Sequence, residues 1–248
     1  MRDERKVDHM AGDTRDSGVR HGVLFDVDGT LVDSNYQHTI AWWQAFRRFG
    51  HDVPMAEIHR AIGMGGDKLV AHLLGEDRDA EQDAELDSTH GAVFSTYWPG
   101  LRAFEGSGEL VRRCADDGLI VVLASSASQQ ELGVLRAIVD ADEAISAATS
   151  SGDAENSKPS PDILKAALDA GGLEAQNAVF VGDAVWDVIA ASELKIPTIA
   201  LASGGTSEAE LRDAGAVEVY KDIRALLDAF DDGALHQLAT SSPSGAES

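Results

Sequence analysis

The chain has 248 residues, and its 44% hydrophobic and 25% charged content is ordinary for a globular protein that can bury a sizeable core. Its formal net charge of −23 argues against binding to nucleic acid or to anionic membranes, because both are bound through lysine and arginine. The same charge repels anionic substrates, so any phosphate site requires cations that are placed locally.

The single cysteine and the two ends of the chain restrict the cellular setting. Cys114 cannot form an internal disulfide, and its setting at residues 110–117 favours a buried helix position over a nucleophile. The first twenty residues lack the apolar stretch of a secretory signal, and no apolar run of about eighteen residues suits a membrane helix. We therefore expect a cytoplasmic protein, a monomer or weak dimer, with flexible polar segments at residues 1–18 and 231–248.

Short apolar runs alternate with helical patterns along most of the chain. Runs without polar alternation are typical of strands buried on both faces of a parallel sheet. Such runs lie at residues 22–26, 120–124, 178–182 and 197–201, and helical patterns lie at 107–117, 129–139, 160–170 and 186–194. This alternation predicts an α/β fold with a doubly wound, Rossmann-like parallel sheet, in which ligands bind beyond the carboxyl ends of the strands.

One stretch breaks this alternation. From about residue 35 to residue 101 the chain has helix-like patterns and no convincing buried strand. We therefore expect an all-helical cap domain at residues 36–99, inserted into a core formed by residues 19–35 and 100–230. The acidic run at residues 76–87 fits a solvated surface, with a metal or partner site as the alternative.

The clearest motif is Asp26-Val-Asp28-Gly-Thr30, directly after an apolar strand. Carboxylates two residues apart on an extended backbone face the same way, and Gly29 allows a sharp turn. Taken alone, the motif could be a simple turn. A calcium loop is excluded by spacing, since the later oxygen ligands of such a loop are missing.

Polar residues also follow or precede the other predicted elements. Ser125 and Ser126 follow the strand at 120–124, and offer hydroxyls and amides for phosphate oxygens. Lys158 precedes a predicted helix, and Asp183 and Asp187 follow the strand at 178–182. Each has a plain explanation in isolation, as a turn serine, a solvated lysine or a capping aspartate. Their order along the chain favours one shared phosphate site.

With these residues in this order, the chain resembles the haloacid dehalogenase superfamily of phosphohydrolases. The resemblance implies that Asp26 is the nucleophile, which forms an aspartyl phosphate, and that Asp28 is the general acid and base. It implies a Mg²⁺ cofactor held by Asp26, Asp183 and the backbone carbonyl of Asp28. It also implies that Lys158 offsets negative charge and binds phosphate, and that Asp187 orients metal-bound water or Lys158.

The resemblance also implies a substrate class. An aspartate at position 28 favours phosphoryl chemistry over dehalogenation. Phosphoglycolate phosphatases and β-phosphoglucomutases enter the cap near Ser34 and His38, which are candidate substrate contacts, although His38 fits a cap-packing or exposed position equally well. An arginine that we expect in the mutases after the glycine loop is missing at residues 62–67. We therefore expect a phosphatase for a small phosphate monoester, phosphoglycolate-like or a sugar phosphate, with a mutase as the alternative.

Overall fold

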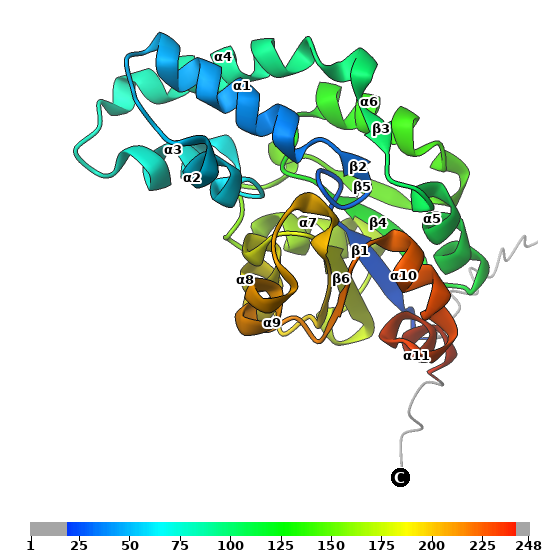
Figure 1. The fold of residues 1–248 in the computed structure, drawn as a ribbon. Coiled ribbons are helices and arrows are strands. Elements are labelled where there is room, and N and C mark those ends of the chain that lie inside the picture. Colours follow the sequence, from blue (N-terminus) through cyan, green and yellow to red (C-terminus); the bar gives the residue numbers. More distant parts are fainter. Residues whose placement is uncertain (1–18, 242–248) are drawn as a thin grey trace, which may run out of the picture.

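The computed structural model describes residues 19–241, and its centre is a six-stranded parallel sheet (Figure 1). The strand order is β5-β4-β1-β6-β7-β8, so β1 lies in the middle and pairs with β4 and β6. The strands are β1 Gly22–Phe25, β4 Ile120–Ala124, β5 Ala147–Thr149, β6 Ala178–Gly182, β7 Thr198–Leu201 and β8 Glu218–Tyr220. The core helices are α5 Ser107–Asp116, α6 Gln129–Val139, α7 Asp162–Gly171, α8 Val185–Glu193, α9 Glu208–Ala214, α10 Ile223–Asp228 and α11 Ala234–Thr240.

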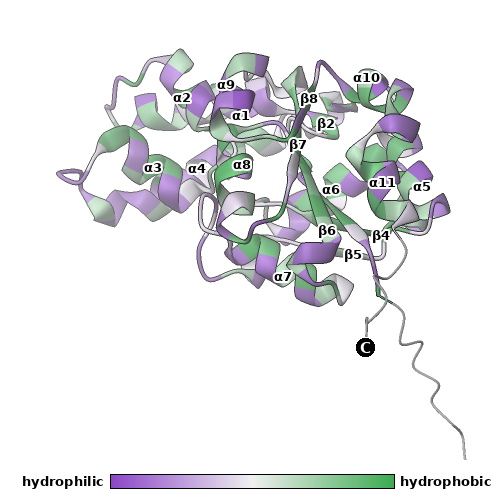
Figure 2. Ribbon diagram, turned by 90° about the horizontal axis from the view of Figure 1, so that it is seen from below, coloured by the Kyte–Doolittle hydropathy of each residue, from purple (hydrophilic) through white to green (hydrophobic). Residues whose placement is uncertain are grey.

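Helices cover both faces of the sheet because successive strand side chains point to opposite faces. Val23 and Phe25 of β1 pack in a cluster with residues of α5, α6, α10 and α11. Leu24, between them, packs on the opposite face with residues of α7 and α8. Figure 2 shows the hydrophobic strands at the centre of this core. The predicted doubly wound α/β fold is confirmed.

A helical insertion, residues 35–100, follows β1 and a two-residue strand. It contains α1 Asn35–Arg48, α2 Met55–Ala61, α3 Gly66–Leu74 and α4 Asp83–Ser95. Two short antiparallel strands, β2 Val32–Asp33 and β3 Arg102–Ala103, pair where the chain leaves and re-enters the core. The insertion has a hydrophobic cluster of its own that includes Trp42, Phe46 and Leu69. In Figure 1 its helices lie over one edge of the sheet.

Flexible segments were predicted at both ends of the chain, and the structure describes residues of only the second. The predicted flexible segment at residues 1–18 lies outside the described residues. The predicted flexible tail at 231–248 is wrong for residues 234–240, because they form α11, whose Leu235 is 1% exposed in the main core cluster. The expected buried position of Cys114 is confirmed on α5.

No helix among residues 19–241 is long and apolar enough to cross a membrane.

Candidate active site at the carboxyl edge of the sheet

The loop after β1 carries Asp26 and Asp28. Asp26 is held in line with the sheet, because its backbone N–H donates to a carbonyl of β6 at 2.9 Å. Gly29 then adopts a φ of +75°, in the left-handed region that favours glycine. A Cβ at this position would lie 2.2 Å from Asn35 Nδ2 and 2.5 Å from Asp183 Oδ2. Glycine therefore permits both the turn and the close approach of these polar side chains.

Lys158 lies between two carboxylates and is only 1% exposed. Its Nζ is 2.5 Å from Asp26 Oδ1 and 2.9 Å from Asp187 Oδ1. Burial acts to lower the pKa of Lys158, but the two carboxylates outweigh it and raise that pKa. The second oxygen of Asp187 accepts the backbone N–H groups of Asp183 and Ala184, each at 3.1 Å, in the first turn of α8. Lys158 is thus a fixed cation beside Asp26.

Asp183 is held by hydrogen bonds from two buried side chains. Thr30 Oγ1 donates to one carboxylate oxygen at 3.0 Å, and Asn35 Nδ2 donates to the other at 2.8 Å. Burial, together with the charges of Asp187 and Asp26, raises the pKa of Asp183 well above its usual range. The carboxylate is therefore rigidly placed but poorly compensated in charge.

Three buried carboxylates meet at this point. Oxygen atoms of Asp26, Asp183 and Asp187 lie within 4.8 Å of one another. Burial raises the pKa of Asp26 to about 7, although Lys158 opposes the shift. A single lysine does not balance three carboxylates in a buried place. Hard oxygen donors with a deficit of positive charge fit a divalent cation such as Mg²⁺.

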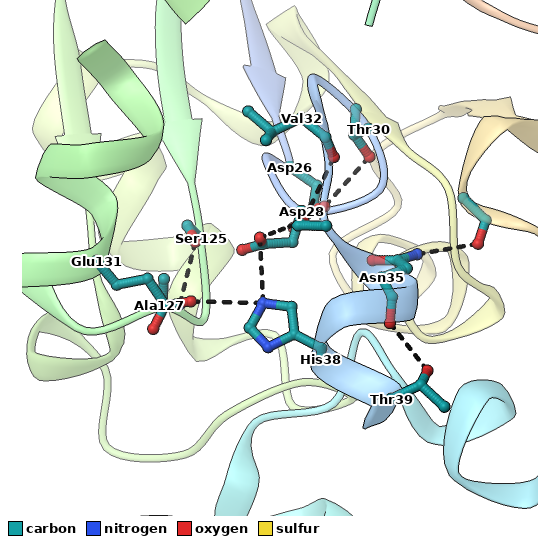
Figure 3. Close-up of polar contacts among 12 residues, drawn as sticks. Asp26, Asp28, Thr30, Val32, Asn35, His38, Thr39, Ser125, Ala127 and Glu131 are labelled. Atoms are coloured by element: carbon teal, nitrogen blue, oxygen red, sulfur yellow. Dashed lines mark hydrogen bonds and ion pairs between the residues drawn. The ribbon is translucent and has the colours of Figure 1, made fainter. Parts of the chain in front are cut away.

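The side chain of Asp28 contacts a different set of residues (Figure 3). Its Oδ1 accepts a hydrogen bond from Ser34 Oγ at 2.5 Å and lies 3.2 Å from His38 Nε2. Burial acts to raise the pKa of Asp28, but His38 and the two hydrogen bonds outweigh it and lower that pKa. Glu131 Oε1 lies 3.5 Å from the same His38 nitrogen, and burial raises the pKa of Glu131 to about 7.

His38 connects this group to the helical insertion. Its Nδ1 is 3.0 Å from His90 Nε2, and its ring stacks on Phe94 with a centroid distance of 3.6 Å. Burial acts to lower the pKa of His38, but Asp28 and Glu131 outweigh it and raise that pKa. Burial and the charge of His38 lower the pKa of His90 well below its usual range. These opposite shifts favour a hydrogen bond from His38 Nδ1–H to His90 Nε2 over the reverse.

The two serines after β4 have different surroundings. Ser125 is 1% exposed, and its Oγ accepts the backbone N–H of Ala127 at 3.0 Å. Ser126 lines a cavity next to Asp26, and its buried Oγ has no hydrogen-bond partner among the described residues. Ser126 is thus the serine whose hydroxyl the described residues leave unpaired next to that cavity.

This cavity, of about 340 Å³, lies between the core and the insertion. Asp26, Asp28 and His38 line it, whereas Ser34 does not and is fully buried behind Asp28. A larger cavity, about 700 Å³, lies between α1, α2 and α8, and is lined by neither Asp26 nor Asp28. The smaller cavity is therefore the one that places a ligand against the first-loop aspartates.

A family model described as haloacid dehalogenase-like hydrolase matches residues 21–195. The chain belongs to this family. The resemblance stated from the sequence is thereby confirmed. The matched range includes every motif residue from Asp26 to Asp187 and the whole helical insertion.

Individual relatives agree with the family. Phosphoglycolate phosphatase from Rhodospirillum rubrum is 27% identical over 83% of this chain and 89% of its own. The chloroplastic protein SUPPRESSOR OF QUENCHING 1 from Arabidopsis thaliana is 31% identical over 85% of this chain, which spans only 20% of that protein. A hydrolase from Pseudomonas syringae has a TM-score of 0.81 at 31% identity, covering 86% of this chain and 99% of its own. The family and its phosphatase members together support phosphatase activity for this enzyme.

The structure brings together most of the residues that the sequence pointed to. Asp26, Lys158, Asp183 and Asp187 form one cluster, and Asp28, Ser34 and His38 form a second beside it. Sequence reasoning gave no role to Thr30, Asn35, His90 or Glu131, which complete these clusters. Thr30 belongs to the first motif, and its position there could have predicted that it lies in the site. The other three lie on helices, and no spacing in the sequence predicted which side of each helix faces the site.

Proposed function

We propose that this haloacid dehalogenase-like hydrolase removes phosphate from a small phosphate monoester in two steps, through an aspartyl phosphate on Asp26. The observation that carries the proposal is the position of Asp26, in the lining of the cavity between core and insertion and beside the buried cation of Lys158. A carboxylate held next to a fixed positive charge can approach an anionic phosphorus centre without prohibitive repulsion.

In the first step a carboxylate oxygen of Asp26 bonds to phosphorus while the bond from phosphorus to the alcohol oxygen breaks. Asp28 gives its proton to that leaving oxygen. The pKa of Asp28 is low in this structure, and an arriving phosphate dianion raises it toward the protonated form that this step needs. In the second step water attacks phosphorus, Asp28 takes the water proton, and inorganic phosphate leaves Asp26.

The proposal assigns Mg²⁺ to the oxygens of Asp26 and Asp183 and to the backbone carbonyl of Asp28, with Asp187 behind them. The fit rests on the three buried carboxylates that meet at this point. When bound, the ion supplies positive charge that offsets both the carboxylates and the phosphate. Lys158, Ser125 and Ser126 are proposed to hold the phosphate oxygens, Ser126 through its free buried hydroxyl.

The size of the cavity and the division of the chain support a small substrate under a cap. We propose that residues 36–99 act as a cap domain over a core formed by residues 19–35 and 100–230. His38 reaches the cavity from this cap, while Ser34 acts on the substrate only through Asp28. A mutase needs a second phosphate site, but the cap side of the cavity presents carboxylates instead of arginine or lysine. This favours the hydrolase.

Release of inorganic phosphate from p-nitrophenyl phosphate tests the proposal. We expect turnover that stops with a chelator and returns when Mg²⁺ is added in excess. Ca²⁺ should support turnover poorly, because its larger and looser ligand shell does not hold the reacting groups in line. Unchanged turnover in excess chelator would refute the metal-dependent mechanism.

A further inference from the structure

The wall of the active-site cavity, formed by cap and core together, carries an unusual distribution of charge. Besides the first-loop aspartates, its walls carry three carboxylates, those of Asp67, Asp87 and Glu131. All three line the same cavity, where the charge of Asp67 helps to raise the pKa of Asp87 and the charge of Asp87 helps to raise that of Glu131. No lysine or arginine of the described chain lines this cavity.

The nearest positive groups are already engaged. His38 contacts both Asp28 and Glu131, and Figure 3 shows both carboxylates approaching the same nitrogen of its ring. Lys68 lies outside the cavity lining, with its Nζ 3.4 Å from Asp67 and 3.4 Å from the side-chain oxygen of Asn156. The part of the cavity lined by Asp67, Asp87 and Glu131 is therefore negative. The phosphate is expected beside Asp26, where Lys158, behind that carboxylate, and the proposed metal ion supply positive charge.

Glu131 is the buried member of this group. The residue is only 9% exposed, and its carboxylate accepts no hydrogen bond from any of residues 19–241. Its one ion-pair neighbour among them is His38, at 3.5 Å. A buried carboxylate without hydrogen bonds is costly to ionise, and a cationic ligand in the cavity would relieve that cost.

The backbone of the cap places the second carboxylate. A Cβ on Gly66 would lie 2.1 Å from Asp87 Oδ1, so a larger residue there would displace that carboxylate from its present position. A Cβ on Gly65 would lie 2.2 Å from the Cβ of Ser157, across the boundary between cap and core. These two glycines bring the acidic end of the cavity close to the core without side chains of their own.

We propose that the preferred substrate is the phosphate ester of a small amino alcohol, whose ammonium group lies among Asp67, Asp87 and Glu131. This inference rests on the proposed function, since it requires the phosphate to lie at Asp26. Opposite charges a few ångströms apart in a partly desolvated cavity attract strongly, and a leaving group with a carboxylate is repelled there. Phosphoglycolate, whose leaving group carries a carboxylate, is therefore expected to be a poor substrate.

Phosphate release by the full chain with Mg²⁺ tests the proposal on esters that differ in the charge of the leaving group. We expect kcat/KM for O-phosphoethanolamine to exceed that for phosphoglycolate at least about tenfold, with glycerol 3-phosphate between them. A phosphoglycolate value equal to or above that of O-phosphoethanolamine would overturn the inference. Absence of turnover on every ester, p-nitrophenyl phosphate included, would instead refute the proposed function. The charge preference would then be decided by calorimetric binding of the same two esters.

Charge-neutral variants test the assigned carboxylates. Asp87→Asn and Glu131→Gln should each lower the ratio of kcat/KM between O-phosphoethanolamine and phosphoglycolate by about tenfold. The ratio cancels losses that affect both esters equally, such as a disturbed His38. Asp169→Asn, an exposed position on α7 outside the cavity lining, removes the same charge and should leave the ratio unchanged. An unchanged ratio in both cavity variants, or an equal change in Asp169→Asn, would overturn the assignment.

Discussion

Asp26 and Asp28 are two residues apart, yet their carboxylates have opposite surroundings. Asp26 is buried beside Asp183 and Asp187 with Lys158 as the compensating cation, and its pKa is raised to about 7. Asp28 accepts hydrogen bonds from Ser34 and His38, and its pKa is lowered. This difference fits a division of roles in which Asp26 bonds to phosphorus next to a metal ion and Asp28 exchanges protons.

Asp28→Asn tests the proton-transfer role. Asparagine removes the proton donor and acceptor, a function worth on the order of 10²–10⁴-fold in rate, but leaves the backbone carbonyl in place. We expect kcat on alkyl phosphates to fall by that factor. Acetyl phosphate, whose leaving group needs little protonation, should still phosphorylate Asp26. Full activity on alkyl phosphates in Asp28→Asn would contradict the assignment.

The buried carboxyls also predict how stability depends on pH. The pKa values of Asp26, Asp183 and Glu131 are raised in the folded state, so between about pH 4 and pH 7 the folded chain binds more protons than the unfolded chain. Their contribution to the free energy of unfolding therefore falls as pH rises through this window. The lowered pKa of Asp28 acts in the opposite sense, but only as pH falls toward about 4 and below.

A divalent cation should reverse this loss. At pH 7.5 and a hundredfold excess over its Kd, Mg²⁺ should raise Tm by roughly 5–10 °C, and at pH 5.5 by much less, because protons compete for the carboxylates. Thermal unfolding with and without Mg²⁺ at the two pH values measures this difference. Asp26→Asn should lose most of the metal response. A metal shift that is equal at both pH values would contradict the shared role of these carboxyls.

The sequence predicted these residues to different degrees. Asp26, Asp28 and Asp183 could be placed because each follows a buried strand, and parallel strands end at one edge of the sheet. Glu131 and His90 could not, because their positions depend on how α6 and α4 pack against the loop. Such packing is a tertiary property that no local pattern encodes.

Among the elements, α11 contradicts what the sequence predicted for its residues. The polar composition of the last residues suggested a flexible tail, but Leu235 is buried and Leu238 packs against the main core cluster. Those two leucines are three residues apart, which is the helical spacing that buries one face. The helix lies beside β1 and β6, the central strands of the sheet, and is therefore a structural part of the core.

Leu235→Ala tests that role. Truncating a buried leucine removes apolar contacts and leaves a cavity, so the free energy of unfolding should fall by about 2–4 kcal/mol. Gln237→Ala, at an exposed position of the same helix, should change it by less than about 0.5 kcal/mol. Urea unfolding of the three proteins gives both numbers. Equal stability of Leu235→Ala and the unchanged protein would show that the helix is dispensable.

The elements that sequence patterns did identify are continuous apolar runs, which became buried strands, and amphipathic patterns, which became helices. The strands at 120–124 and 178–182 and the helix at 129–139 match the structure residue for residue. The edge strands β5 and β8 were not identified, because each is three residues long and only partly buried. An edge strand has one neighbour and needs no continuous apolar run, so it leaves a weak pattern.

At the scale of the whole molecule, the net charge of −23 opposes the approach of any phosphate dianion. Raising ionic strength from about 0.01 M to about 0.1 M shortens the screening length from about 30 Å to about 10 Å. We therefore expect kcat/KM for phosphate monoesters to rise several-fold over this range, with kcat at saturation unchanged. Steady-state rates in sodium chloride measure this effect. A fall in kcat/KM with salt would contradict net repulsion as the dominant long-range force.

The central claim is that phosphate passes through a covalent bond to Asp26, and one measurement addresses it directly. The enzyme with Mg²⁺ and acetyl phosphate is quenched in acid during turnover and digested, and its peptides are analysed by mass spectrometry. The account predicts one phosphate, on the peptide that contains Asp26, with more of it in Asp28→Asn and none in Asp26→Asn. Phosphate on any other residue, or full activity in Asp26→Asn, would contradict it.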